Sequence, residues 1–148
     1  MFKLFRKLIK LALIVAILIG SFIGLLGYFK YREAIKNVPI EVKVTSIRED
    51  SNYTPLNEIS TDFTDSIVAI EDRRFYEHGA VDIIALARAT FINLKEKQVL
   101  QGGSTLTQQV AKNIYFSNDQ NFVRKVGELF VAYNLEKIYS KDEILELY

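Results

Sequence analysis

The chain has 148 residues, 49% of them hydrophobic and 25% charged, and this length allows one domain with a modest core but hardly two. The formal net charge is +1, but the acidic residues all lie in 31–148, where 14 basic and 18 acidic residues leave a net charge of −4. This balance argues against a nucleic-acid partner, and the absence of cysteine excludes disulfides, thiol nucleophiles and cysteine-ligated metals.

Residues 11–29, LALIVAILIGSFIGLLGYF, carry no charge. At ~1.5 Å per residue, a helix of this length approaches the ~30 Å thickness of a hydrocarbon core. Because four basic residues precede it, the positive-inside rule predicts a cytoplasmic segment at 1–10, a transmembrane helix at 11–29 and an extracytoplasmic remainder. A cleaved signal peptide is the alternative, but the apolar stretch is long for one and no Ala-x-Ala-like site follows.

Residues 30–53 are interpreted as a linker. In the stretch PIEVKVTSI, the apolar residues Ile40, Val42 and Val44 alternate with polar ones, which predicts a short, half-buried strand. The following DSNYTP has the composition of a turn.

From about Ile59 onward the sequence predicts helices joined by loops. Phe63, Ile67 and Ile70 fall on one helical stripe, and Glu71 lies at its edge, so we expect this carboxylate to be partly desolvated, as suits a general base. The alternative is a helix-terminal acid paired with a neighbouring arginine. His78, the single histidine, is more easily understood as a hydrogen-bonded structural residue than as a metal ligand.

A second helix is predicted at 81–97, with one apolar face that we expect to pack in the core: Ile84, Ala87, Phe91 and Leu94. It is followed by QGGSTLTQQVAKN, in which two glycines give an open backbone and Ser104 can cap the next helix. Thr105, Gln109 and Lys112 lie off the apolar stripe of that helix. A glycine-rich loop leading to a helix start with hydroxyls and a lysine suits a phosphate-bearing anion, although an ordinary capped amphipathic helix fits the same pattern.

A helix at 122–139 has two apolar surfaces and should be buried on two sides. Arg124 and Glu128 lie one turn apart on it. They can form a structural ion pair, or, beside an anion, Glu128 can orient the arginine or hold a cation. The next residues, SKDE, form a capping box of Ser140 with Glu143 that opens another helix.

Taken together, EDRRFYEH, QGGSTLTQQVAKN and RKVGELFVAYNLEKIYSKDEILELY, in this order behind one apolar segment, resemble the peptidoglycan glycosyltransferase domain (glycosyltransferase family 51). This domain occurs in monofunctional transglycosylases and in the N-terminal part of class A penicillin-binding proteins. The resemblance covers 54–148 and implies a mainly α, lysozyme-like domain that is C-terminally truncated at Tyr148. The implied activity is polymerisation of lipid II into β-1,4 glycan strands with release of undecaprenyl diphosphate, at the outer face of the bacterial cytoplasmic membrane and without a nucleotide cofactor.

The resemblance also implies roles for individual residues. Glu71 matches the catalytic base, and Glu128 matches the second catalytic glutamate, which stabilises the leaving diphosphate through basic residues or through a divalent metal, Mg or Mn. The implied substrate-binding residues are Phe75, Ser104, Thr105, Gln108, Gln109, Lys112, Asn113, Arg124 and Lys125. The implied partners are lipid II, the growing glycan strand, the membrane and other cell-wall synthases.

Two other functions remain open. A truncated, non-catalytic membrane-anchored partner in cell-wall synthesis would have the same motifs. A lysozyme-like hydrolase would need a buried acid near Glu71 but would have no use for a cationic loop, and is therefore the weaker alternative.

Overall fold

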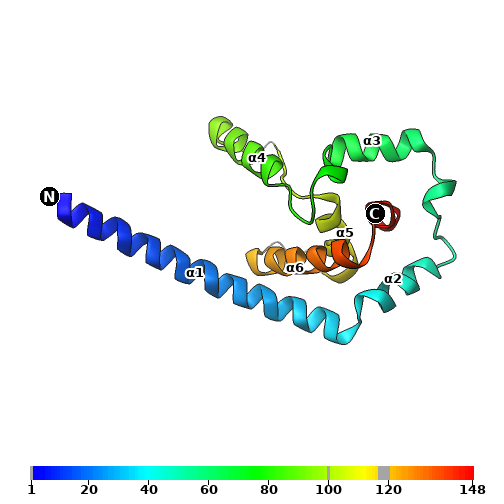
Figure 1. Cartoon of the computed structure of the whole chain (residues 1–148), viewed down its shortest axis with the longest axis horizontal. Coiled ribbons are helices and arrows are strands. Elements are labelled where there is room, and N and C mark those ends of the chain that lie inside the picture. Colours follow the sequence, from blue (N-terminus) through cyan, green and yellow to red (C-terminus); the bar gives the residue numbers. More distant parts are fainter. Residues whose placement is uncertain (1, 100, 117–120) are drawn as a thin grey trace.

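A computed structural model describes residues 2–99, 101–116 and 121–148, and within these ranges all regular structure is helical (Figure 1). This confirms the mainly α prediction. The elements in chain order are α1 (Phe2–Asn37), α2 (Ile40–Arg48), η1 (Leu56–Glu58), α3 (Thr61–Glu71), η2 (Phe75–Glu77), α4 (Ile83–Glu96), α5 (Leu106–Tyr115), α6 (Phe122–Ile138) and α7 (Lys141–Leu147).

Helix α1 is the longest element, with 36 residues; its N-terminal half projects as a straight rod from the rest of the chain, while its C-terminal half lies beside α6 (Figure 1). Its most apolar window has a mean hydropathy of 2.6 and is not buried by other parts of the protein, so the helix is long and apolar enough to cross a membrane. The helix does not end with the apolar segment. It continues through Lys30 and Arg32 to Asn37, so the anchor candidate and the first part of the expected linker form one helix.

The strand predicted around Ile40–Val44 is wrong, because these residues form the start of α2. Apolar residues at every second position also satisfy the spacing of four that one helical face requires. Ile40 and Val44, four apart, are the buried pair, whereas Val42 is 56% exposed. Pro39 precedes the helix as its N-cap residue, where the missing backbone N–H has no consequence. The predicted turn after it is present at 49–52.

The core lies between α5, α6 and α7, with α1 and α2 against one side. Helix α6 is packed on two faces, as predicted. Val131 and Leu135 are fully buried toward the core, while Phe130 contacts the rings of Tyr28 and Tyr31 in α1. The predicted capping box of Ser140 and Glu143 is present at the start of α7.

Helices α3 and α4 pack less than the sequence predicts. In α3, Phe63 is 60% exposed and Ile70 79% exposed. In α4, which extends away from the core in Figure 1, Phe91 and Leu94 are exposed and Ala89 is the one buried residue of the helix. The expected core face of α4 is therefore wrong for the described chain, because periodicity shows that a helix is amphipathic without showing what covers its apolar face.

Candidate functional site

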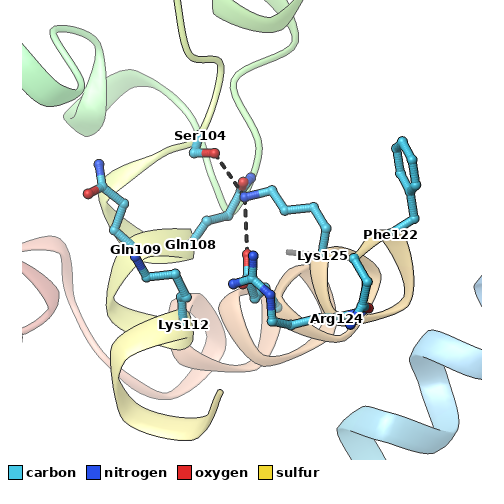
Figure 2. A pocket seen from close by; sticks show the side chains of 9 residues that line it. Ser104, Gln108, Gln109, Lys112, Phe122, Arg124 and Lys125 are labelled. Carbon is cyan, nitrogen blue, oxygen red and sulfur yellow. Dashed lines mark hydrogen bonds and ion pairs between the residues drawn. The ribbon is translucent and has the colours of Figure 1, made fainter. Parts of the chain in front are cut away.

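A pocket of about 520 Å³ opens between the start of α5 and the first half of α6 (Figure 2). Its charged lining consists of Lys112, Arg124, Lys125 and Glu128, which gives the pocket a net charge of +2. The uncharged lining residues are Ser104, Gln108, Gln109, Asn121 and Phe122. An excess of cations with amide and hydroxyl groups around it is suited to an anionic ligand.

Glu128 is the buried centre of this pocket, with 1% of its surface exposed. One carboxylate oxygen accepts a short hydrogen bond from Arg124, one turn earlier on α6, and the other lies 3.1 Å from Lys125 Nζ. The spacing of four residues between Arg124 and Glu128 therefore forms the ion pair that was predicted. Glu128 holds both cations at the pocket, and Nε of Arg124 is buried without a hydrogen-bond partner among the described residues.

A second pocket, of about 420 Å³, lies on the other side of Ser104 and is lined by Glu71, Arg73, Arg74 and Arg88. Two contacts connect the pockets. Gln109, which lines the first pocket, donates from Nε2 to Glu71 Oε2 at 2.9 Å. Lys125 Nζ donates to Ser104 Oγ at 2.8 Å, which is one of the dashed lines in Figure 2. Glu71, the expected base, is therefore adjacent to the expected anion-binding residues, because Gln109 of α5 contacts Glu71 and also lines the first pocket.

Glu71 itself is exposed at the end of α3. The expectation that the folded protein partly desolvates this carboxylate is wrong for the described chain, because the stripe of Phe63 and Ile70 beside it is also exposed. The Glu71 carboxylate is held by its hydrogen bond from Gln109, which connects α3 to α5.

The start of α5 is capped by the protein itself. Asp72 Oδ2 accepts from the backbone N–H of Leu106 at 3.0 Å, and Thr105 is the N-cap residue, with its side chain accepting from the N–H of Gln108. The predicted cap, Ser104, lies one residue too early. Because a carboxylate already occupies this helix start, the attraction for an anion comes from the side-chain cations rather than from free backbone N–H groups.

Asp72, His78 and Asp82 bring three possible metal ligands within 4.8 Å of one another. Their oxygens, however, already accept hydrogen bonds. Asp72 Oδ1 lies 2.7 Å from His78 Nε2, and Asp82 Oδ1 accepts from two backbone N–H groups at the start of α4. Burial would raise the pKa of Asp82, but these hydrogen bonds and the charge of Arg74 lower it. The cluster therefore fits a structural role, joining η2 to the starts of α4 and α5, better than it fits a metal site.

Glu128, the other residue expected to hold a metal, has both carboxylate oxygens engaged by cations. A divalent ion there would have to displace Arg124 or Lys125, so the described geometry does not fit a metal at this residue. It fits the other possibility named from the sequence, in which the basic residues themselves act on the ligand.

The structure brings most of the predicted site residues to these two pockets, but not Phe75 or Asn113. Phe75 is fully buried under Lys141, whose Nζ lies 4.3 Å from the ring centre, and Asn113 is exposed and lines neither pocket. Sequence reasoning missed Asn121, which caps α6 and lines the first pocket. An asparagine directly before an amphipathic helix is a signal that could have identified it.

The fold and the site define a helical protein with a long apolar helix, a cationic pocket and a carboxylate beside that pocket. The sequence model of the Transglycosylase family matches residues 39–148, which is well over half of the chain. The chain belongs to this family, so the resemblance described from its motifs is confirmed.

Related proteins agree with this assignment. The monofunctional glycosyltransferase of Staphylococcus haemolyticus is 36% identical over 143 residues, which cover 97% of this chain and 50% of that protein. Penicillin-binding protein 1F of Bacillus subtilis is 35% identical over 165 residues, covering 100% of this chain and 23% of that protein. A relative from Cupriavidus necator is 40% identical over 146 residues, covering 99% and 61%. The chain thus spans less than two thirds of the length of each of these relatives.

Proposed function

We propose that the protein is a membrane-anchored peptidoglycan glycosyltransferase that polymerises lipid II into β-1,4 glycan strands and releases undecaprenyl diphosphate. The observation that carries the proposal is the connection between Glu71 and the cationic pocket through Gln109. Membership of the transglycosylase family and the similarity to monofunctional glycosyltransferases support it.

In this reaction, Glu71 takes the proton of the acceptor sugar's 4-hydroxyl as the oxygen attacks the anomeric carbon of the donor. The new C–O bond forms as the bond from that carbon to the diphosphate breaks, and the electron pair leaves with the diphosphate. Gln109 orients the Glu71 carboxylate by its hydrogen bond. An exposed base is compatible with this role, because the bound sugars displace water from it.

The cations of the first pocket receive the leaving diphosphate. Lys112, Arg124 and Lys125 supply charge that is already oriented before the ligand arrives, because Glu128 and Ser104 hold two of them. The buried Nε of Arg124 has no hydrogen-bond partner among the described residues, so an anionic oxygen would be a suitable acceptor for it. These side chains therefore stabilise the departing group by compensating its charge.

We place α1 across the cytoplasmic membrane, with the N-terminus inside and the catalytic part outside. The basic residues before the apolar segment support this orientation. The other partners are the growing glycan strand and other cell-wall synthases.

The test is a polymerisation assay with lipid II, using the full chain in detergent and the Staphylococcus haemolyticus enzyme as a positive control. We expect glycan strands from the wild-type chain, and for Glu71→Gln a fall in rate of roughly 10² to 10⁴ with little change in donor binding. The matched variant Asp65→Asn removes an exposed acid of the same helix and should retain the wild-type rate.

Near-normal turnover by Glu71→Gln would show that Glu71 is not the base. If the positive control polymerises lipid II and the wild-type chain does not, while the chain still binds a cell-wall synthase, the non-catalytic partner function is the correct one.

A further inference from the structure

Helices α1 and α6 cross at two glycines. A Cβ atom on Gly27 would overlap with the side chain of Val126, so no side chain fits there, and one on Gly127 would meet the Phe116 ring at 3.2 Å and the Gly27 carbonyl oxygen at 3.5 Å. Glycine at both positions therefore allows the two backbones to approach closely.

The contacts beyond this crossing show that the two helices run in the same direction. Gly27 meets Val126, and one turn further along both helices the rings of Tyr31 and Phe130 are 5.7 Å apart. Going one turn back from Val126 therefore leads toward the apolar part of α1, to the level of about Ile23. Figure 1 shows the same arrangement, with α6 beginning above the apolar part of α1.

The crossing thus lies inside the uncharged segment 11–29, about 3 Å from its end, and Phe122 lies about 6 Å deeper. Phe122 is then about 9 Å inside the end of the segment, so if this segment spans the hydrocarbon core of a bilayer, the first turn of α6 lies below the lipid head groups, in the outer part of the acyl chains. Phe122, at 82% exposure, is then in contact with lipid. Arg124 and Glu128 are each two residues from Val126, about 200° around the helix, so they face the pocket while Val126 faces α1.

We propose that Gly27 and Gly127 are positioning residues that set the depth of the cationic pocket, so that it takes a diphosphate whose lipid chain is still embedded in the membrane. This inference rests on the proposed function. One face of α6 contacts the anchor helix and the opposite face carries Arg124 and Glu128, so a change in the crossing moves the cations relative to the membrane surface.

The depth can be measured without any catalysis. Because the sequence has no cysteine, Phe122→Cys and Tyr133→Cys each give a single site for a nitroxide label in liposomes, where collision with oxygen and with a water-soluble nickel complex reports depth. We expect the label at 122 below the head groups, accessible to oxygen and not to nickel, and the label at 133, about 16 Å further along α6, at or above the head groups and accessible to nickel. In the background of Gly27→Val, the label at 122 should move outward and become accessible to nickel.

Gly24→Val is the matched control, because a Cβ on this glycine, one turn earlier on the same helix, meets no atom of the described residues within 4 Å. It should leave both depths unchanged. Gly27→Val combined with Val126→Gly exchanges the small and large residues across the crossing and should restore the depth of the label at 122. Such a rescue would show that the effect of Gly27→Val comes from this contact and not from general misfolding. A label at 122 that is fully accessible to nickel in the wild-type background, or an unchanged depth in Gly27→Val, would overturn the proposal.

A second measurement connects depth to substrate. For Gly27→Val we expect KM to rise roughly tenfold for lipid II in liposomes and to stay unchanged for a short-chain, water-soluble analogue, with Gly24→Val like the wild type on both. An equal loss on both substrates would indicate a merely structural role and would overturn the proposal. If the wild-type chain uses neither substrate, the proposed function fails, whereas the label depths still decide where the pocket lies.

Discussion

Glu128 shows how one buried residue can organise a site that binds its opposite charge. A carboxylate that is 1% exposed is costly to desolvate unless it is paired, and here Arg124 and Lys125 each take one of its oxygens. Its charge cancels one cation of the pocket, but its hydrogen bonds fix the direction of both. Glu128 therefore weakens the attraction of the pocket for an anion, but it holds the two cations in place before the anion binds.

This arrangement predicts that Glu128→Gln affects ligand binding rather than proton transfer. The amide keeps the shape but loses the charge-assisted hydrogen bonds, so Arg124 and Lys125 are no longer held in place. We expect KM for lipid II to rise roughly tenfold, about 1.4 kcal/mol, with a smaller effect on kcat than Glu71→Gln has. Initial rates over a range of lipid II concentrations measure both. If Glu128→Gln had a normal KM and a large fall in kcat, Glu128 rather than Glu71 would act in proton transfer, and the assigned roles would be wrong.

At this scale, the sequence predicts contacts within a helix better than contacts between helices. The pair of Arg124 and Glu128 follows from their spacing of four residues. The contact of Gln109 with Glu71, and the cap that Asp72 provides for Leu106, join segments that are far apart in the chain, and no local pattern specifies them. Exposure of Glu71 was mispredicted for the same reason, because burial depends on what other elements cover.

Among the elements, α2, η1 and α7 are joined through one acidic residue of α7. Glu146 accepts hydrogen bonds from Arg48 at 3.2 Å and from the Leu56 backbone N–H at 3.1 Å. Burial would raise the pKa of Glu146, but hydrogen bonds from Tyr53, Leu56 and Arg48 and the charge of Arg48 lower it below its usual 4.5. These contacts attach the short α7 to the segment that follows α1.

The lowered pKa sets a pH dependence of stability. Because the folded state holds the ionised form of Glu146, its contribution is complete above pH 4.5 and is lost as pH falls through the lower folded value. Glu146→Gln should therefore lower the free energy of unfolding by about 1 kcal/mol at pH 7 and by less at pH 3. Thermal unfolding of the chain in detergent at both pH values measures this, with Glu49→Gln, an exposed acid at the end of α2, as the control. An equal loss at both pH values would contradict the assignment.

The spacing of apolar residues alone does not always distinguish a strand from a helix. The stretch beginning at Ile40 satisfies both a strand and a helix, and the packing of Ile40 and Val44 against the core decides for the helix. By contrast, the start of α7 is predicted at the correct residue, because its capping box of Ser140 and Glu143 is a strong local signal.

For the whole molecule, the main asymmetry is between a packed half and an open half. The core of α5, α6 and α7 is closed, whereas α3 and α4 expose large apolar side chains such as Phe63, Ile70 and Phe91. The sequence predicted the apolar faces of these helices correctly and their burial incorrectly. Helix α1, in contrast, is identified from composition alone as a helix that is long and apolar enough to cross a membrane, because its central stretch of residues is uncharged.

The topology of the molecule can be tested directly. Four basic residues precede the apolar segment of α1, so a reporter fused after Tyr148 should report an extracytoplasmic location, and one fused before Met1 a cytoplasmic location. Alkaline phosphatase and green fluorescent protein fusions in bacterial cells distinguish the two. Replacing Lys3, Arg6, Lys7 and Lys10 by glutamine should weaken the orientation. Phosphatase activity confined to the N-terminal fusion would reverse the assigned topology.

The crossing of Gly27 with Val126 and Gly127 also has a consequence for how the chain folds. Its two sides are separated by most of the sequence, so the contact cannot form until α6 has been synthesised. By that time α1 has long left the ribosome, and it can already be a finished helix in the bilayer. In the proposed topology, α1 is then a fixed template in the membrane, and α6 docks onto it late in the folding of the domain.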